Sequence, residues 1–132
     1  MSRGALRRVA LAAALAGAAA CLDATSPGGI LKVTLATPTP TPGADGAILL
    51  TVTGPTALTS VAAVAGLRVF AEPLSTTNHF AVTGPLPNGV LLTIGVRDVT
   101  RASQYVATIQ DVAAATTYQL RALAGYSLTI SR

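Results

Sequence analysis

Residues 90–96 read Val-Leu-Leu-Thr-Ile-Gly-Val, and this stretch decides the fold class of the chain. Every second residue from Val90 to Val96 is aliphatic, which is the period of a β-strand that turns one face toward a core. Asn88-Gly89 stands just before the stretch, and this dipeptide is typical of a tight turn. The stretch therefore predicts a half-buried strand that is entered from a turn.

The same alternation, interrupted by glycine or proline, recurs along the chain and predicts seven to nine short strands. Many short strands with such turns favour an all-β fold, a single small antiparallel β-sandwich. Helical periodicity is not evident after residue 20, and we expect Ala113–Ala115 to add one short helical turn within a loop. The expected strands are 30–36, 48–53, 61–64, 67–72, 79–83, 90–96, 105–110, 118–122 and 126–130.

Composition limits the function classes. The chain has 132 residues, of which 51% are hydrophobic and 11% charged, so it has room for one ordinary domain and is too apolar for a disordered tail. One Cys and one His exclude an intrachain disulfide and multi-cysteine or multi-histidine zinc sites. Of the nine basic residues, Arg3, Arg7 and Arg8 lie at the start and the others are scattered. We therefore expect no metal, no cofactor and no nucleic-acid partner.

The first 20 residues have the pattern of a secretory signal. Residues 1–8 are short and cationic, and residues 9–20 form an uninterrupted run of Val, Ala, Leu and Gly. That run is shorter than the roughly 20 residues that a bilayer-spanning helix requires. We expect residues 1–20 to be a signal helix, residues 21–29 a flexible spacer that is rich in Pro, Gly and Ser, and residues 30–132 the β-domain.

The signal ends in Ala18-Ala19-Ala20-Cys21, which resembles the lipobox of bacterial lipoproteins, although Leu is usual where Ala18 stands. The resemblance implies cleavage between Ala20 and Cys21 and lipidation of the Cys21 thiol. Leu22 follows, where Asp often marks retention in the inner membrane, so the resemblance implies an outer-membrane protein in an organism that has one. The alternative is plain secretion to the periplasm or beyond, because Ala-x-Ala triplets in residues 16–20 also suit an ordinary signal peptidase.

The expected β-domain resembles the immunoglobulin-like or cohesin-like sandwiches of bacterial surfaces, in particular short lipoproteins built as lipobox, spacer and one β-domain. The resemblance is architectural, since the chain has no Trp and no Cys pair. Alternate prolines in Thr37–Gly43 favour a stiff, extended loop between the first two strands. Fold resemblance of this kind does not supply a function.

Catalytic and metal-binding patterns are weak. His79 would need Ser75 as nucleophile and Asp98 or Asp111 to orient it, but its place between Asn78 and Phe80 predicts a surface histidine. The carboxylates have simpler explanations. We expect Asp45 in a turn before Gly46, and Asp98 at a solvated strand end with Arg97 and Arg101. The sequence therefore predicts no catalytic residue.

The aromatic residues divide into two groups. Phe80, Tyr105, Tyr118 and Tyr126 share the inward phase of their expected strands, so we expect them in the core. Phe70 has the outward phase together with Arg68 and Glu72. These three residues are the candidate interaction surface.

Together these patterns predict a lipid-anchored cell-envelope protein with a non-enzymatic structural or interaction module, attached to the membrane through its N-terminal lipid. An envelope protein or a glycan is the expected kind of partner. The alternative is a glycan- or peptide-binding surface module, and the weakest alternative is a hydrolase that uses His79.

Overall fold

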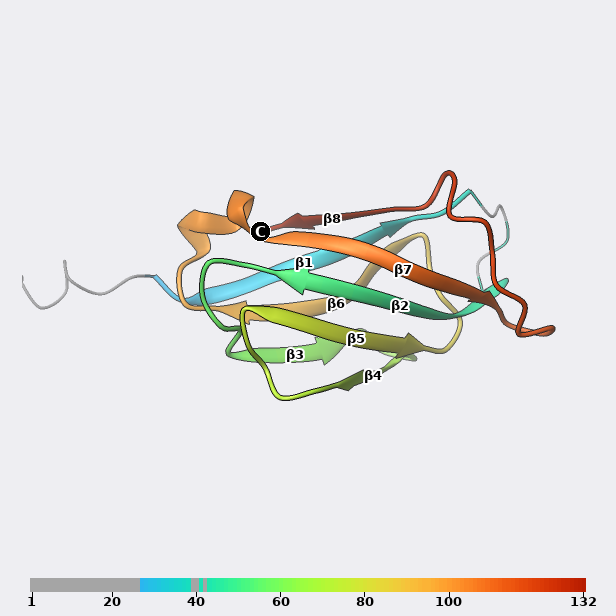
Figure 1. Ribbon diagram of the computed structural model, residues 1–132, viewed down its shortest axis with the longest axis horizontal. Coiled ribbons are helices and arrows are strands. Elements are labelled where there is room, and N and C mark those ends of the chain that lie inside the picture. The colour runs from blue at the N-terminus through green and yellow to red at the C-terminus, as the bar shows by residue number, and fades with distance from the viewer. Residues whose placement is uncertain (1–26, 39–40, 42) are drawn as a thin grey trace, which may run out of the picture.

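The computed structural model describes residues 27–38, 41 and 43–132. Within these residues, eight strands form two four-stranded antiparallel sheets that pack face to face (Figure 1). One sheet has the order β3-β6-β1-β8 and the other β4-β5-β2-β7, and we call them the β1 sheet and the β2 sheet. The expectation of one small all-β antiparallel sandwich is confirmed.

The strand bounds follow the sequence prediction closely over most of the chain, and a short 3-10 segment, η1, precedes β7. The elements are β1 (Gly29–Ala36), β2 (Asp45–Thr53), β3 (Ser60–Ala63), β4 (Arg68–Ala71), β5 (Thr77–Thr83), β6 (Gly89–Val96), η1 (Val99–Gln104), β7 (Val106–Ala114) and β8 (Ser127–Ser131).

The five middle strands have the neighbour relations of strands B to F in an immunoglobulin sandwich. Strands β4, β5 and β2 stand side by side as D, E and B do, and β3 pairs with β6 as C pairs with F. The outer strands differ, because β1 takes the place beside β6 that strand G would hold and β7 takes the place beside β2 that strand A would hold. An additional strand, β8, follows beside β1.

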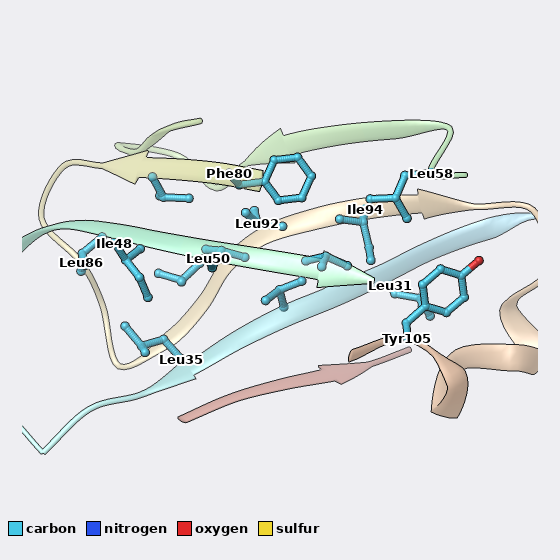
Figure 2. Packing of buried hydrophobic residues seen from close by; sticks show 14 of the residues in the cluster. Leu31, Leu35, Ile48, Leu50, Leu58, Phe80, Leu86, Leu92, Ile94 and Tyr105 are labelled. Atoms are coloured by element: carbon cyan, nitrogen blue, oxygen red, sulfur yellow. The ribbon is translucent and has the colours of Figure 1, made fainter. Parts of the chain in front are cut away.

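The core lies between the sheets and is built by alternate residues of each strand. In β1, Leu31, Val33 and Leu35 are buried whereas Lys32 and Ala36 are exposed. Figure 2 shows side chains from strands of both sheets meeting in this layer. Burial of each large aliphatic side chain contributes about 1.5–3 kcal/mol to folding. A slip by one residue would turn these side chains to the other face of the sheet, so the alternation fixes the register.

Strand β6 departs from simple alternation at one point. Val33 lies opposite Leu92 but Thr34 lies opposite Val90, so Leu91 is an extra residue in β6. Such a bulge lets two successive side chains face the same side, and both Leu91 and Leu92 are fully buried. The aliphatic run that predicted the strand therefore contributes an additional leucine to the core.

Two local predictions are wrong. The expected helical turn at Ala113–Ala115 is not formed, because Ala113 and Ala114 end β7 and pair with β2. The expected strand 118–122 is reduced to one isolated bridge between Ala113 and Leu120. The helical segment lies instead at η1, where the Asp98 carboxylate accepts a hydrogen bond from the backbone N–H of Thr100 and caps the first turn.

Antiparallel pairing gives the sandwich two distinct ends (Figure 1). The start of β1 and the end of β8 lie at the same end, where the Val99 N–H also donates a hydrogen bond to the Pro27 carbonyl at 2.9 Å. We call this the termini end. The opposite end, the loop end, carries the β1–β2, β3–β4, β5–β6 and β7–β8 connections.

Candidate functional site

A cavity of about 610 Å³ opens at the loop end, between the start of β2, the end of β5 and the end of β7. Its lining consists of three glycines, four alanines, Pro85, Thr83 and Tyr118. The hydroxyls of Thr83 and Tyr118 are the only polar side-chain groups in this lining. The volume lies in the range of small-ligand sites, and the chemistry suits a neutral ligand. We call it the Tyr118 cavity.

Two glycines explain the bare floor of the Tyr118 cavity. Gly46 is an extra residue of β2 opposite β7, and a Cβ there would lie 2.8 Å from the Cα of Ala115. Gly84 follows β5 with φ of +123°, a conformation that side chains rarely allow. A side chain at Gly46 would clash with Ala115, and one at Gly84 would strain the backbone, so both positions contribute only backbone to the cavity.

Tyr118 stands at the rim of this cavity with its side chain 81% exposed. Its φ is +58°, and its N–H donates a hydrogen bond to the Ala114 carbonyl at 3.1 Å. The prediction that Tyr118 faces the core is therefore wrong, because a residue in the left-handed region cannot continue a strand. Left-handed backbone at a bulky residue costs energy and is often found at functional sites.

The loop that carries Tyr118 is fastened by a buried carboxylate. Asp45 is 3% exposed, and it accepts hydrogen bonds from Nε of Arg121 at 2.9 Å and from the hydroxyl of Tyr126 at 2.7 Å. We call these three residues the Asp45 cluster. The expectation that Asp45 serves only a turn is wrong, because it is the first residue of β2 and joins segments 76 and 81 residues away. The wall of the cavity is therefore preorganised.

A second hollow, of about 440 Å³, lies on the outer face of the β2 sheet. Phe70 and Leu49 are 57% and 43% exposed, and both pair with Ala81, from opposite sides. The short side chain of Ala81 forms the floor between them, and Glu72 and His79 complete part of the rim. We call it the Phe70 hollow.

The expected surface of Phe70, Arg68 and Glu72 is only partly assembled. Phe70 is exposed, as its outward phase predicted, and it shares the hollow with Glu72. Arg68 is exposed at the start of β4, opposite Thr83, and is not among the residues that line the hollow. Leu49, across Ala81 from Phe70, lines the hollow instead, so the surface is more apolar than the sequence suggested.

The four groups considered for a hydrolase lie on β5, on β7 and in two connections. His79 is exposed, as predicted, and its Nδ1 lies 3.2 Å from the Thr51 hydroxyl. The Ser75 hydroxyl donates to the Thr77 carbonyl at 2.6 Å. Of the two candidate carboxylates, Asp98 caps η1 at the termini end and Asp111 is exposed on β7.

Asp98, which caps η1, has a lowered pKa. The hydroxyl of Thr100 donates to the carboxylate at 2.5 Å, and this bond holds the pKa of Asp98 below its ordinary value of 3.8. The backbone N–H of Thr100 and the Arg101 side chain add to the effect. Within residues 27–38, 41 and 43–132, no group of three or more His, Cys, Asp or Glu side chains could hold a metal ion.

The lipidation and cleavage residues predicted from the sequence, Cys21 and Ala20, lie outside the described residues, as does the signal segment 1–20. Among the residues that the structure describes, no helix has the length and apolar character that crossing a membrane requires. No family model, curated protein or solved structure shows a significant match to this sequence. The two candidate sites therefore rest on their geometry and chemistry.

Sequence reasoning missed the Tyr118 cavity and the Asp45 cluster. The available signal for the cavity was a set of small residues in the connections between the ends of expected strands, namely Gly43, Gly46, Ala47, Gly84 and Ala113–Ala115. Antiparallel pairing gathers such strand ends at one end of a sandwich. Asp45 and Arg121 carried no local signal, because their contact joins distant parts of the chain.

Proposed function

We propose that this chain is a lipid-anchored cell-envelope protein whose β-sandwich is a non-enzymatic interaction module. In this proposal Cys21 carries the lipid, cleavage occurs after Ala20, and Leu22 permits transport to the outer membrane. The Ala18–Cys21 pattern directly after a short apolar run supports the anchor. Attachment by two or more acyl chains needs no membrane-spanning helix.

The tether in this proposal is short. Strand β1 begins at Gly29, eight residues after Cys21. Eight residues extend at most about 28 Å. The sandwich would therefore stay close to the bilayer and meet partners in the same membrane or in the layer next to it.

The observation that carries the interaction role is the Phe70 hollow. Single exposed apolar residues are ordinary on protein surfaces. Here Phe70 and Leu49 flank Ala81 on an outer sheet face, so a side chain of a partner can insert between two apolar walls. Inserted apolar anchors of this kind dominate the energetics of protein interfaces.

Metabolic labelling with a clickable fatty acid tests the anchor. We expect label on the full chain and its loss in Cys21→Ala, with the protein moving from the membrane fraction to the soluble fraction. Absence of label from the unaltered chain, or label that survives Cys21→Ala, would refute the anchor without bearing on the hollow.

A paired substitution tests the hollow. We expect Phe70→Ala to lower the recovery of a membrane partner by at least tenfold in a cross-linked pull-down, because apolar anchor residues are worth about 2 kcal/mol or more. Tyr118→Ala is the matched control, since it also removes an exposed aromatic ring but lies at the loop end. Equal recovery with Phe70→Ala and with the unaltered chain would exclude the hollow as the contact surface.

The Tyr118 cavity supports a second candidate, binding of a neutral glycan or peptide. An aromatic ring that is 81% exposed beside a cavity is a platform for stacking, with a hydroxyl for one hydrogen bond. A glycan and peptide array probed with the full chain tests this, with Tyr118→Ala expected to abolish binding and Phe70→Ala to preserve it. The reverse pattern would assign binding to the Phe70 hollow.

A further inference from the structure

Strand β8 is an edge strand with one open side. Among the described strands it pairs with β1 alone, from Lys32 opposite Ser131 to Ala36 opposite Ser127, without a register shift. Apart from the ladder with β1, no backbone hydrogen bond in the described part of the chain joins residues 127–131 to another segment, although β7 and η1 pack nearby. Its outer row of N–H and C=O groups is therefore available to a further strand.

The other edge strands carry features that discourage pairing. Strands β3 and β4 have four residues each, and β4 begins with a charged residue, Arg68. Strand β7 is longer, but two register shifts disturb its pairing with β2 and Asp111 is exposed on it. Strand β8 has no charge, no proline, no glycine and no bulge between Ser127 and Ser131. It lacks the usual protection of an edge.

The sequence of β8 is almost the same in both directions, Ser-Leu-Thr-Ile-Ser. In an antiparallel pair of two β8 strands related by a two-fold axis at Thr129, Thr129 faces Thr129 of the partner subunit. Leu128 then faces Ile130 of the partner subunit, and Ser127 faces Ser131 of the partner subunit. Threonine pairs and aliphatic pairs are favourable across antiparallel strands, and a two-fold contact requires such self-complementarity.

The burial pattern of β8 fits the same pairing. Leu128 and Ile130 are half-buried and pack against the core, whereas Ser127, Thr129 and Ser131 are exposed. A second β8 would cover the open flank of Leu128 and Ile130 while its polar residues stayed in solvent. Strand β1 shows the same alternation of buried and exposed residues, so the buried face and the exposed face would each continue across the joined sheet.

We propose that two copies of this chain associate through β8, which joins the two β1 sheets into one antiparallel sheet of eight strands. The partner is a second copy of the same chain, and the contact is centred on Thr129. The association does not depend on a lipid anchor, so it can be tested in chains in which Cys21 is replaced.

Cysteine cross-linking tests the register. In full-length chains that carry Cys21→Ser, Thr129→Cys places the introduced thiol opposite its own copy, at a Cα separation of about 4.5–5.5 Å that permits a disulfide. We expect Thr129→Cys to give at least five times more disulfide-linked dimer than Ser127→Cys, which is on the same strand and also exposed. A mixture of Ser127→Cys and Ser131→Cys chains should give the cross-linked heterodimer. Equal cross-linking by Thr129→Cys and Ser127→Cys overturns the proposal.

Sedimentation provides a second measurement. We expect full-length chains that carry Cys21→Ser to show a concentration-dependent rise toward twice the monomer mass. Thr129→Lys should abolish that rise, because two like charges would then face each other across the axis. Thr108→Lys, at an exposed position of β7, is the matched control and should leave it unchanged. A chain that stays monomeric across the whole concentration range, or a loss of association with both variants, contradicts the proposal.

Discussion

Replacement of Asp45 by asparagine tests whether the Asp45 cluster fastens the β7–β8 loop to the sandwich. The Asp45 carboxylate is buried, and it accepts hydrogen bonds from Arg121 and Tyr126. Asparagine has nearly the same size and keeps one oxygen acceptor, so the substitution removes the charge with little change in packing. The loop from residue 115 to residue 126 should then be held less firmly.

The structure sets the magnitude of the effect. A hydrogen bond to a charged group contributes about 1.5–3 kcal/mol. Removal of one member of a fully buried ion pair costs about 3–5 kcal/mol, but the Arg121 side chain is 39% exposed and its charge can be hydrated when the partner is lost. We therefore expect Asp45→Asn to lower the free energy of unfolding by about 2 kcal/mol, and the melting temperature by roughly 8 °C for a body of this size.

Urea unfolding followed by circular dichroism measures this change, and an unchanged denaturant slope shows that the same surface is exposed. Tyr126→Phe removes one bond to the same carboxylate, so the double variant should be less destabilised than the sum of the single variants by about 1 kcal/mol. Asp111→Asn is the control, an exposed carboxylate on β7. A loss below about 0.5 kcal/mol in Asp45→Asn, or strict additivity with Tyr126→Phe, would refute the reasoning.

Three further outcomes are expected. Asn78→Ala should lower the free energy of unfolding by about 2–4 kcal/mol in urea titration, because the buried amide bonds Ser75 twice and Val52 once; a loss under 1 kcal/mol would contradict this. Tyr118→Gly should leave stability unchanged or raise it by up to about 1 kcal/mol, since it relieves the left-handed backbone; marked destabilisation would show that the exposed ring packs. Thr100→Val should raise the pKa of Asp98 toward 3.8 in an NMR titration. A lowered carboxyl pKa stabilises the folded chain at pH values above the unfolded-state pKa, and this stabilisation is lost as the pH falls through the folded-state pKa. The stability of Thr100→Val should therefore depend less on pH in the acid range. An unmoved pKa would exclude the Thr100 hydroxyl as the cause of the shift.

The sandwich could be predicted from the sequence because its signal is local. Residues such as Val33 and Leu50 reveal their burial through the alternation of their own strands. The bulge at Leu91 was not predictable in the same way, since alternation marks Leu91 as outward and only its register against β1 shows otherwise. Periodicity thus identifies strands well and irregularities within them poorly.

The functional residues were harder to predict because their roles depend on distant contacts. Asp45-Gly46 has the composition of a turn, and its true role depends on Arg121 and Tyr126 far along the chain. Tyr118 alternates with Leu120 as a strand residue would, but the backbone turns through the left-handed region there. Phe70 was predicted correctly because its exposure follows from the phase of its own strand.

The proximity of the two described chain ends has a consequence for how the sandwich can be joined to other proteins. Ser131 lies opposite Lys32, which is five residues from Pro27, or roughly 17 Å along the chain. A linker of about five residues would bridge that gap, and the chain could then be reopened at the exposed Gly66, which lies in the turn between β3 and β4. The domain is therefore suited to circular permutation and to insertion into a surface loop of a host protein.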